Sequence, residues 1–367
     1  MSRRQNRARR AVGGALVLLG LALPLMAQDS SGAAEAAAVV EPLIETYGVS
    51  GAEQRVSDEV RRLLPTWAAP VTDSAGNLWL EVGQGDPVVV FIAHQDEIGF
   101  RVTAINDDGT LNLEARGGFF TSLYEAEAAL VHTDRGDVPG VFMPRDTGFS
   151  RREPPPLHVN LGVSARSAAA ALGVQVGNTV TMPKQFVRLA GTRASGRSAD
   201  DRVGCAALIL ALRHLDRTRL RHEVVFIWSA REETGLEGAA VAAARLGATT
   251  RRVHAIDQFV TSDSPVEPEN YADAPLGLGP VARALDNSAV SPPAELDSLE
   301  ALARARGIPL QVGATGGGND GSVFTPYGAP DVAIGWPTRN AHSPVEVFDL
   351  ADVAHLADLV QAIAEDW

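Results

Sequence analysis

Four short, continuously apolar runs constrain the fold of this 367-residue chain more than any other feature. They cover residues 88–93, 224–228, 253–256 and 332–335. Apolar runs of this length, without alternating polar residues, indicate strands that are covered on both faces. Helical patterns at 202–215, after Asp200 and Asp201, and at 350–365, after Asp349, alternate with these runs. The sequence therefore predicts an α/β fold built around one sheet.

A second kind of pattern interrupts the first between about residues 101 and 194. Short segments of alternating polarity are separated there by Asp-Gly, Gly-Asp and Pro-rich turns, with one helical stretch at 165–172. This is typical of a small β-rich module. The chain then returns to the α/β pattern, so we expect an inserted domain at 101–194 and a catalytic domain formed by 29–100 and 195–367. Within the first part, residues 30–38 have low complexity, and 39–64 predict two short helices broken at Gly48 and Gly51.

Residues 1–28 have the pattern of a signal peptide. Five arginines precede an apolar run at 11–27, and small residues and a polar QDSSG segment follow it. The run is shorter than a membrane span and contains Gly and Pro, although an uncleaved anchor stays the alternative. The pattern predicts an exported protein, periplasmic or extracellular. The only cysteine, Cys205, cannot form an intrachain disulfide and is expected to be buried.

The charge balance argues against nucleic-acid binding. The formal net charge is −13, and Lys184 is the only lysine. Binding to phosphates requires clustered Lys and Arg. We therefore expect no nucleic-acid partner.

Acidic residues and histidines fall where the predicted strands end. Because the carboxyl ends of parallel strands form the binding edge of an open α/β sheet, these side chains are expected to converge. Bringing many negative charges together requires a bound cation. The positions are His94, Asp200, Glu232, Glu233, Asp257 and His342.

This set of side chains suits two metal ions. Nitrogen and carboxylate ligands without a usable cysteine favour Zn²⁺, with Co²⁺ or Mn²⁺ possible. Two neighbouring ions need a bridging carboxylate, for which an aspartate at a helix start such as Asp200 is suited. The adjacent glutamates allow one carboxylate to bind metal while the other accepts a proton.

These motifs resemble the cocatalytic-metal glutamyl, leucyl and deblocking aminopeptidases that assemble as tetrahedral dodecamers. The resemblance covers nearly the whole chain after residue 28, through ETYGVSGAEQRV, AHQDEIGF, ADDRVGCA, SAREETGLEGA, GGGNDGS and PTRNAHSPVE. It implies a mixed-sheet, zinc-peptidase-like catalytic domain with a small β domain inserted. It also implies peptide substrates with free N-termini and a homo-oligomer, from a dimer to a dodecamer.

The resemblance also implies a role for each site residue. One metal ion would be held by His94 and Asp257, and the other by Glu233 and His342. Asp200 would bridge the two ions. Glu232 would be the general base, and Asp96 would orient His94.

Four positions depart from the family pattern without removing a ligand. Gln95 stands where Met is usual, Ala199 and Ala341 replace bulkier residues, and Asn319 replaces a Thr. Two other functions stay open. One is a related dinuclear-metal carboxypeptidase or amidase acting on acyl-amino acids, and the other is an inactive exported binding protein on the same scaffold.

Overall fold

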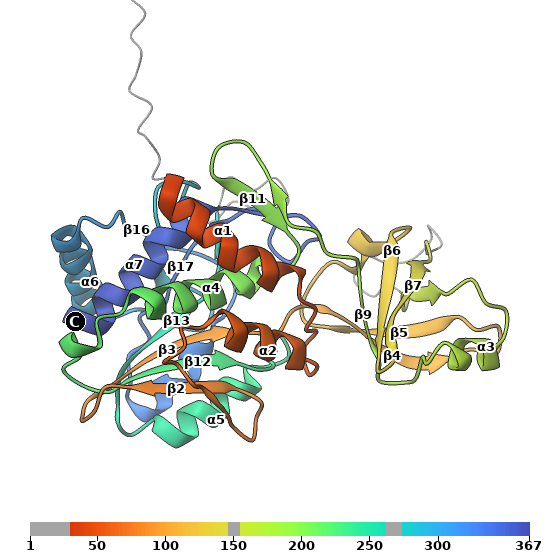
Figure 1. Cartoon of the computed structure of the whole chain (residues 1–367), viewed down its shortest axis with the longest axis horizontal. Helices are drawn as coiled ribbons and strands as arrows, with labels where there is room; N and C mark the ends of the chain where they lie inside the picture. Colours follow the sequence, from red (N-terminus) through yellow and green to blue (C-terminus); the bar gives the residue numbers. More distant parts are fainter. Residues whose placement is uncertain (1–29, 146–154, 262–273) are drawn as a thin grey trace, which may run out of the picture.

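An eight-stranded mixed sheet forms the centre of the larger domain in the computed structural model, which describes residues 30–145, 155–261 and 274–367 (Figure 1). Strands β12, β3, β13 and β17 run parallel, whereas β2 and β15 pair antiparallel with the ends of this group. The order across the sheet is β1 (Val71–Thr72), β2 (Leu78–Val82), β12 (Val224–Ser229), β3 (Val88–His94), β13 (Thr250–Ile256), β17 (Ile334–Gly335), β15 (Val281–Leu285) and β16 (Gln311–Ala314). All four predicted apolar runs supply strands of this sheet, and the run at 332–335 forms only the two-residue β17.

Helices cover both faces of the sheet. One face carries α1 (Ser30–Glu45), α2 (Gln54–Leu63), α4 (Ala199–His214), α6 (Pro293–Arg306) and α7 (Leu350–Asp366). The other face carries α5 (Glu237–Leu246) and the 3₁₀ segment η3 (Asp320–Tyr327). A further 3₁₀ turn, η2, spans Arg217–Arg219. Both faces are therefore closed to water, as the apolar strand runs predicted.

Helix α1 corrects one expectation. The first helix was expected from residue 39, after the low-complexity stretch at 30–38, but that stretch already belongs to α1. Ala33, Ala36 and Ala37 are buried in the core shared with α4 and α7. Alanine has the highest helix propensity and allows close packing of helices, so an Ala-rich segment is well suited to this layer.

The inserted module is a closed β-barrel at one end of the molecule (Figure 1). Phe100, Tyr124 and Phe142 pack ring against ring in its core. Helix α3 (Arg166–Ala171) and the 3₁₀ turn η1 (Thr121–Tyr124) lie between barrel strands in the chain. The strands follow one another around the barrel as β4 (Gly99–Ile105), β5 (Leu111–Arg116), β8 (His158–Asn160), β7 (Gly136–Phe142), β6 (Ala128–Thr133) and β9 (Thr179–Thr181).

The chain leaves the barrel after β9 and joins a small sheet on the larger domain. There β11 (Arg193–Gly196) pairs with both β10 (Val187–Arg188) and β19 (Glu346–Asp349). Residues 187–194 of the predicted insert thus belong to this small sheet and not to the barrel. A two-stranded sheet of β14 (Phe259–Val260) and β18 (Pro337–Thr338) lies next to the end of β13.

The start of α4 ties a helix to the end of a central strand. Asp200 and Asp201 have non-helical backbone angles, so regular helix begins at Arg202, where the sequence predicted it. The Asp201 carboxylate accepts hydrogen bonds from the backbone N–H of Gly204 (3.0 Å) and of His94 (2.9 Å). It therefore caps the helix and fixes the last residue of β3.

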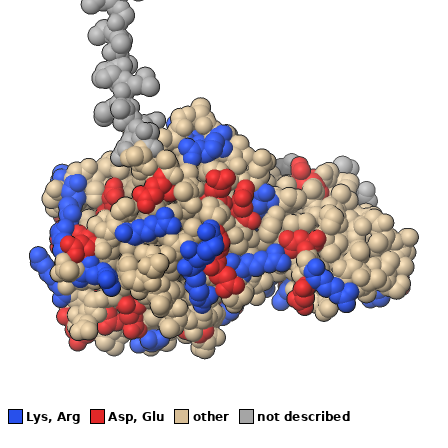
Figure 2. Space-filling model, in the orientation of Figure 1, with Lys and Arg blue, Asp and Glu red and all other residues tan. Residues whose placement is uncertain are grey.

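Acidic and basic side chains are interspersed on the face shown in Figure 2, where no large basic patch gathers among the described residues. Within the ranges that the structure describes, no helix has the length and apolarity needed to cross a bilayer. The predicted signal peptide, 1–28, lies outside those ranges.

Candidate metal centre

The predicted site residues converge at the carboxyl edge of the central sheet. His94 is the last residue of β3, and Asp257 directly follows β13. Glu232 and Glu233 follow β12, Asp200 lies at the start of α4, and His342 comes from the connection between β18 and β19. Because β12, β3 and β13 are parallel, their ends open onto the same space.

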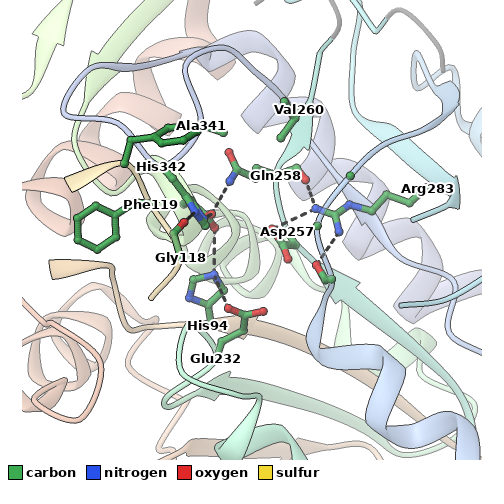
Figure 3. A pocket seen from close by; sticks show the side chains of 15 residues that line it. His94, Gly118, Phe119, Glu232, Asp257, Gln258, Val260, Arg283, Ala341 and His342 are labelled. Atoms are coloured by element: carbon green, nitrogen blue, oxygen red, sulfur yellow. Dashed lines mark hydrogen bonds and ion pairs between the residues drawn. The ribbon is translucent and has the colours of Figure 1, made fainter. Parts of the chain in front are cut away.

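Asp200 lies between His94 and His342, the two histidines labelled in Figure 3. Its Oδ1 is 3.0 Å from Nε2 of His94, and its Oδ2 is 2.9 Å from Nε2 of His342. The Gln258 side-chain amide also donates to Oδ2. Each carboxylate oxygen therefore faces a different imidazole nitrogen, the arrangement expected of a carboxylate shared by two ligand sets.

The adjacent glutamates occupy different surroundings. Glu233 Oε1 lies 3.7 Å from Nε2 of His342. His94, Asp200 and Glu233 each offer one atom that could bind a metal ion, and these three atoms lie within 4.8 Å of one another. Glu232 Oε2 lies 3.9 Å from Nε2 of His94 and lines a cavity of about 340 Å³. One glutamate is thus grouped with possible metal ligands, and the other borders the open space.

Asp96 holds the loop that carries both glutamates. Its fully buried carboxylate accepts the backbone N–H of Glu232 (3.0 Å) and of Glu233 (3.2 Å). Its Oδ1 lies 3.5 Å from Nδ1 of His94, and its backbone carbonyl lies 3.3 Å from the same nitrogen. Asp96 therefore links the ends of β3 and β12 and also faces the ring of His94.

Asp257 differs from the other acidic residues because a protein cation faces it. Its Oδ1 lies 3.1 Å from a guanidinium nitrogen of Arg283. The same guanidinium lies 3.3 Å from Asp286 and donates to the carbonyl of Gly318. Asp257 lines the same cavity as His94 and Asp200. It is not one of the three residues whose possible ligand atoms lie within 4.8 Å of one another.

The electrostatics of the site show an excess of negative charge. Burial and the neighbouring Asp200 raise the pKa of Glu233 to about 7 and that of Asp257 to about 6, although nearby cationic groups oppose the rise. Burial alone would also raise the pKa of Asp200, but hydrogen bonds from His342 and His94 hold it well below its usual range. The Asp200 carboxylate is thus the one that the two imidazoles stabilise in its charged form.

The donor set fits divalent metal ions. Imidazole nitrogens and carboxylate oxygens are the ligand types of Zn²⁺, Co²⁺ and Mn²⁺ sites. Among the described residues, no hydrogen-bond partner satisfies the buried Oε1 of Glu233. A buried carboxylate oxygen without a donor is costly, and a bound cation would remove that cost.

Two acidic residues of this region escaped sequence reasoning. Glu346 is buried and accepts the backbone N–H of His342 (2.8 Å) and of Asp200 (3.3 Å). Asp320 is buried beside Ser229, and its Oδ1 has no described partner. Glu346 ends the PTRNAHSPVE motif, four residues after His342, so its place in that motif could have indicated a supporting role.

Comparison with known proteins agrees with this geometry. The family model for M42 glutamyl aminopeptidases matches residues 76–359. The chain belongs to the M42 glutamyl aminopeptidase family.

Named relatives and a solved structure are similar to this chain over most of its length. A putative aminopeptidase of Acetivibrio thermocellus is 30% identical over 323 residues, which cover 86% of this chain and 94% of that protein. The lysyl aminopeptidase of Pyrococcus furiosus is 29% identical and covers 89% of this chain and 96% of its own length. The TET1 peptidase of Pyrococcus horikoshii has a TM-score of 0.80 and 33% identity, over 89% of this chain and 98% of that one.

The M42 assignment confirms the predicted resemblance, the α/β fold with an inserted β domain, and the enzyme class. The chain is a metallo-aminopeptidase of this family, and the family implies cocatalytic metal ions. His94, Asp200 and Glu233 form a possible site for them.

Proposed function

We propose that this M42 aminopeptidase uses two divalent metal ions to hydrolyse the N-terminal peptide bond of peptides. One ion would be held by His94 and Asp257 and the other by Glu233 and His342, with Asp200 shared between them. The observation that carries this proposal is the position of Asp200, whose two oxygens each face the Nε2 of a different histidine. Zn²⁺ is the expected metal, and Co²⁺ or Mn²⁺ also suit the ligands.

When bound, two such ions would polarise the scissile carbonyl and lower the pKa of an attacking water. Glu232 would then accept a proton from this water at its carboxylate and deliver it to the leaving amine. Its place in the cavity wall supports this role, because Glu232 borders the space that a substrate would enter. The N–H bonds to Asp96 would hold Glu232 and Glu233 in their separate positions.

One pair of variants can test which glutamate binds metal and which accepts the proton. Glu232→Gln should keep its metal and lose at least ~10²-fold in kcat, the usual contribution of an acid–base group. Glu233→Gln should lose metal first. Metal content and kcat should be measured on both variants. If Glu232→Gln loses metal and Glu233→Gln keeps it, the two roles are reversed.

A free substrate N-terminus is expected to be required. The carboxylates around the cavity would attract an amino group, so the site would trim from the end. The metal-loaded enzyme should cleave aminoacyl-p-nitroanilides and leave their N-acetylated forms intact. Preference for the acylated substrates would instead support the carboxypeptidase or amidase alternative, and binding without turnover of either would support an inactive scaffold.

We further propose that the protein is exported and that residues 1–28 are removed. The arginine-rich start followed by a short apolar run supports this proposal. N-terminal sequencing of periplasmic or secreted material should begin near Gln28 to Ser31. An exported fraction that begins at Met1 would make the segment an anchor.

Self-association through the barrel is also proposed. The TET1 peptidase of Pyrococcus horikoshii is described as assembling into a tetrahedron or a large octahedral shell. In this chain Phe120 is 75% exposed and Leu123 is 40% exposed on the barrel. Exposed apolar side chains of this kind favour contact with another protein surface. Light scattering should show a homo-oligomer, and a strictly monomeric active enzyme would exclude this role.

A further inference from the structure

The two site histidines are oriented by different domains. The Nδ1 of His94 faces Asp96, which lies in the same catalytic domain. The Nδ1 of His342 instead lies 2.6 Å from the backbone carbonyl of Gly118, in the loop that follows barrel strand β5. The barrel therefore reaches into the centre through a main-chain atom (Figure 3).

The contact with Gly118 determines which imidazole nitrogen is free to bind an ion. A carbonyl oxygen can only accept, so Nδ1 of His342 must carry the hydrogen in this hydrogen bond. Nε2 lies 2.9 Å from the Asp200 carboxylate and donates to it here, and its lone pair becomes available once an ion displaces that hydrogen. The backbone N–H of His342 is held at the same time by Glu346. With an ion on Nε2, the ring has one possible tautomer, Nδ1–H, and these two contacts hold it in one orientation.

The neighbouring Gly117 brings the same loop against Glu233. Its φ of +97° favours glycine, and a Cβ built there would lie 2.6 Å from Cγ2 of Ile98 and 3.1 Å from Oε2 of Glu233. Any larger residue would push the loop away from both groups. The loop continues into Phe119, whose ring packs edge-on against Phe100 in the barrel core, with centroids 5.2 Å apart.

We propose that the barrel loop at Gly117–Gly118 is a positioning element of the metal centre, which fixes the Nδ1–H tautomer of His342 and the place of Glu233. This inference rests on the proposed function, in which these two side chains hold one of the two ions. It gives the barrel a part in building the site, separate from any part in assembly. The ion at His94 and Asp257 does not depend on this loop.

The test is metal binding by the metal-free protein, measured by calorimetric titration with Zn²⁺. In Gly117→Ala one ion should bind about 10–100-fold more weakly, the usual effect of losing an outer hydrogen bond to a ligand, and the other should bind as in the wild type. Two ions bound at wild-type affinities by the folded variant would overturn the inference. So would equal weakening of both ions, which would indicate general damage.

Gly109→Ala is the matched control. Gly109 lies at the opposite end of the same β4–β5 hairpin, with a φ of +85°, and a Cβ there would lie 2.8 Å from Cγ2 of Val163. The substitution therefore adds similar strain to the barrel away from the site. It should lower the melting temperature while leaving both metal affinities unchanged. The same selective loss of one ion in Gly109→Ala would contradict the inference.

Two further variants keep the result decisive. If Gly117→Ala does not fold, Phe119→Leu should weaken the same ion by a smaller factor, because it loosens the loop from Phe100, and unchanged binding would then overturn the inference. His342→Ala tests the underlying function. If His342→Ala still binds two ions normally, the ligand assignment fails. If it loses one ion and Gly117→Ala does not, only the role of the loop fails.

Discussion

Two buried acidic clusters lie close together in this protein and differ in what neutralises them. Glu97 is fully buried, and its carboxylate lies 2.6 Å from Arg197, 2.9 Å from Lys184 and 3.6 Å from Arg202. In the candidate metal centre, the buried Oε1 of Glu233 has no hydrogen-bond partner among the described residues. The chain thus surrounds Glu97 with three basic side chains, whereas the His342 imidazole, 3.7 Å away, is the basic group that faces this oxygen of Glu233.

The pKa shifts express the same contrast. Burial would raise the pKa of Glu97, but Arg197, Lys184 and Arg202 outweigh it and hold the pKa well below its usual range. For Glu233, burial prevails over the attraction of His342, and its pKa rises to about 7. A buried carboxylate is stable in its charged form only beside a cation. The chain itself therefore neutralises the first cluster, whereas the second suits the cocatalytic metal ions that the M42 family implies.

The largest expected effect comes from breaking the Glu97 cluster. Glu97→Gln leaves the buried side chains of Arg197, Arg202 and Lys184 facing a neutral amide, and it should cost about 3–5 kcal/mol of unfolding free energy, the usual cost of removing one partner of a buried ion pair. Urea unfolding of the metal-free wild type and variant measures this difference. A loss below about 1 kcal/mol would mean that the cluster does not depend on its carboxylate.

The stabilisation by Glu97 should also depend on pH. Its pKa in the folded protein lies below the value of 4.5 expected without perturbation. The contribution is therefore present above pH 4.5 and is lost as the pH falls towards the lowered folded-state pKa. Unfolding curves collected from pH 7 to pH 3 should show the wild type and Glu97→Gln becoming more alike. A gap that widened towards acid pH would contradict the pairing.

The same substitution in the metal centre should have the opposite sign. In the metal-free protein at pH 8, Glu233→Gln removes a buried charge from a repulsive cluster and should raise stability by about 2–3 kcal/mol, the scale of the rise in the Glu233 pKa from 4.5 to about 7. With saturating Zn²⁺ the order should reverse, because the wild type gains more from binding. Thermal unfolding with and without metal measures both. Destabilisation of the metal-free variant would show that Glu233 is already paired.

The smallest change in unfolding free energy is expected for a surface ion pair, which serves as a reference for the Glu97 and Glu233 variants. Arg101 and Glu114 form an ion pair of 2.7 Å on the barrel with both side chains nearly half exposed. Glu114→Gln should change unfolding free energy by less than about 0.5 kcal/mol, because water screens the pair. The same urea assay applies. If Glu114→Gln lowered the unfolding free energy as much as Glu97→Gln, burial would not explain why the Glu97 cluster is expected to matter more.

The sequence predicted the metal centre better than the cluster at Glu97. Strand ends mark the centre, since β3 and β13 are apolar runs that finish at His94 and just before Asp257. The family resemblance then gave each position a role. By contrast, Lys184 and Arg197 meet Glu97 only because the chain returns from the barrel beside β4, and no local pattern reveals such a pairing.

Sequence patterns also do not predict features that depend on tertiary contacts. The alanines at the start of α1 were interpreted from composition, whereas their packing on α4 and α7 decides their structure. Closure of the barrel depends on pairing six short strands that are spread between Gly99 and Thr181. The carbonyl of Gly118 beside His342 follows from that closure, and a backbone atom gives no signal in side-chain patterns.

The most direct test of this account is the number of metal ions per chain in active enzyme. The metal-free protein should be titrated with Zn²⁺ by calorimetry, and activity on an aminoacyl-p-nitroanilide followed in parallel. We predict two ions per chain, with full activity only when both are bound and loss of activity on chelation. Full activity with one ion per chain would contradict the dinuclear centre, and full activity with none would contradict the role of metal in neutralising the cluster.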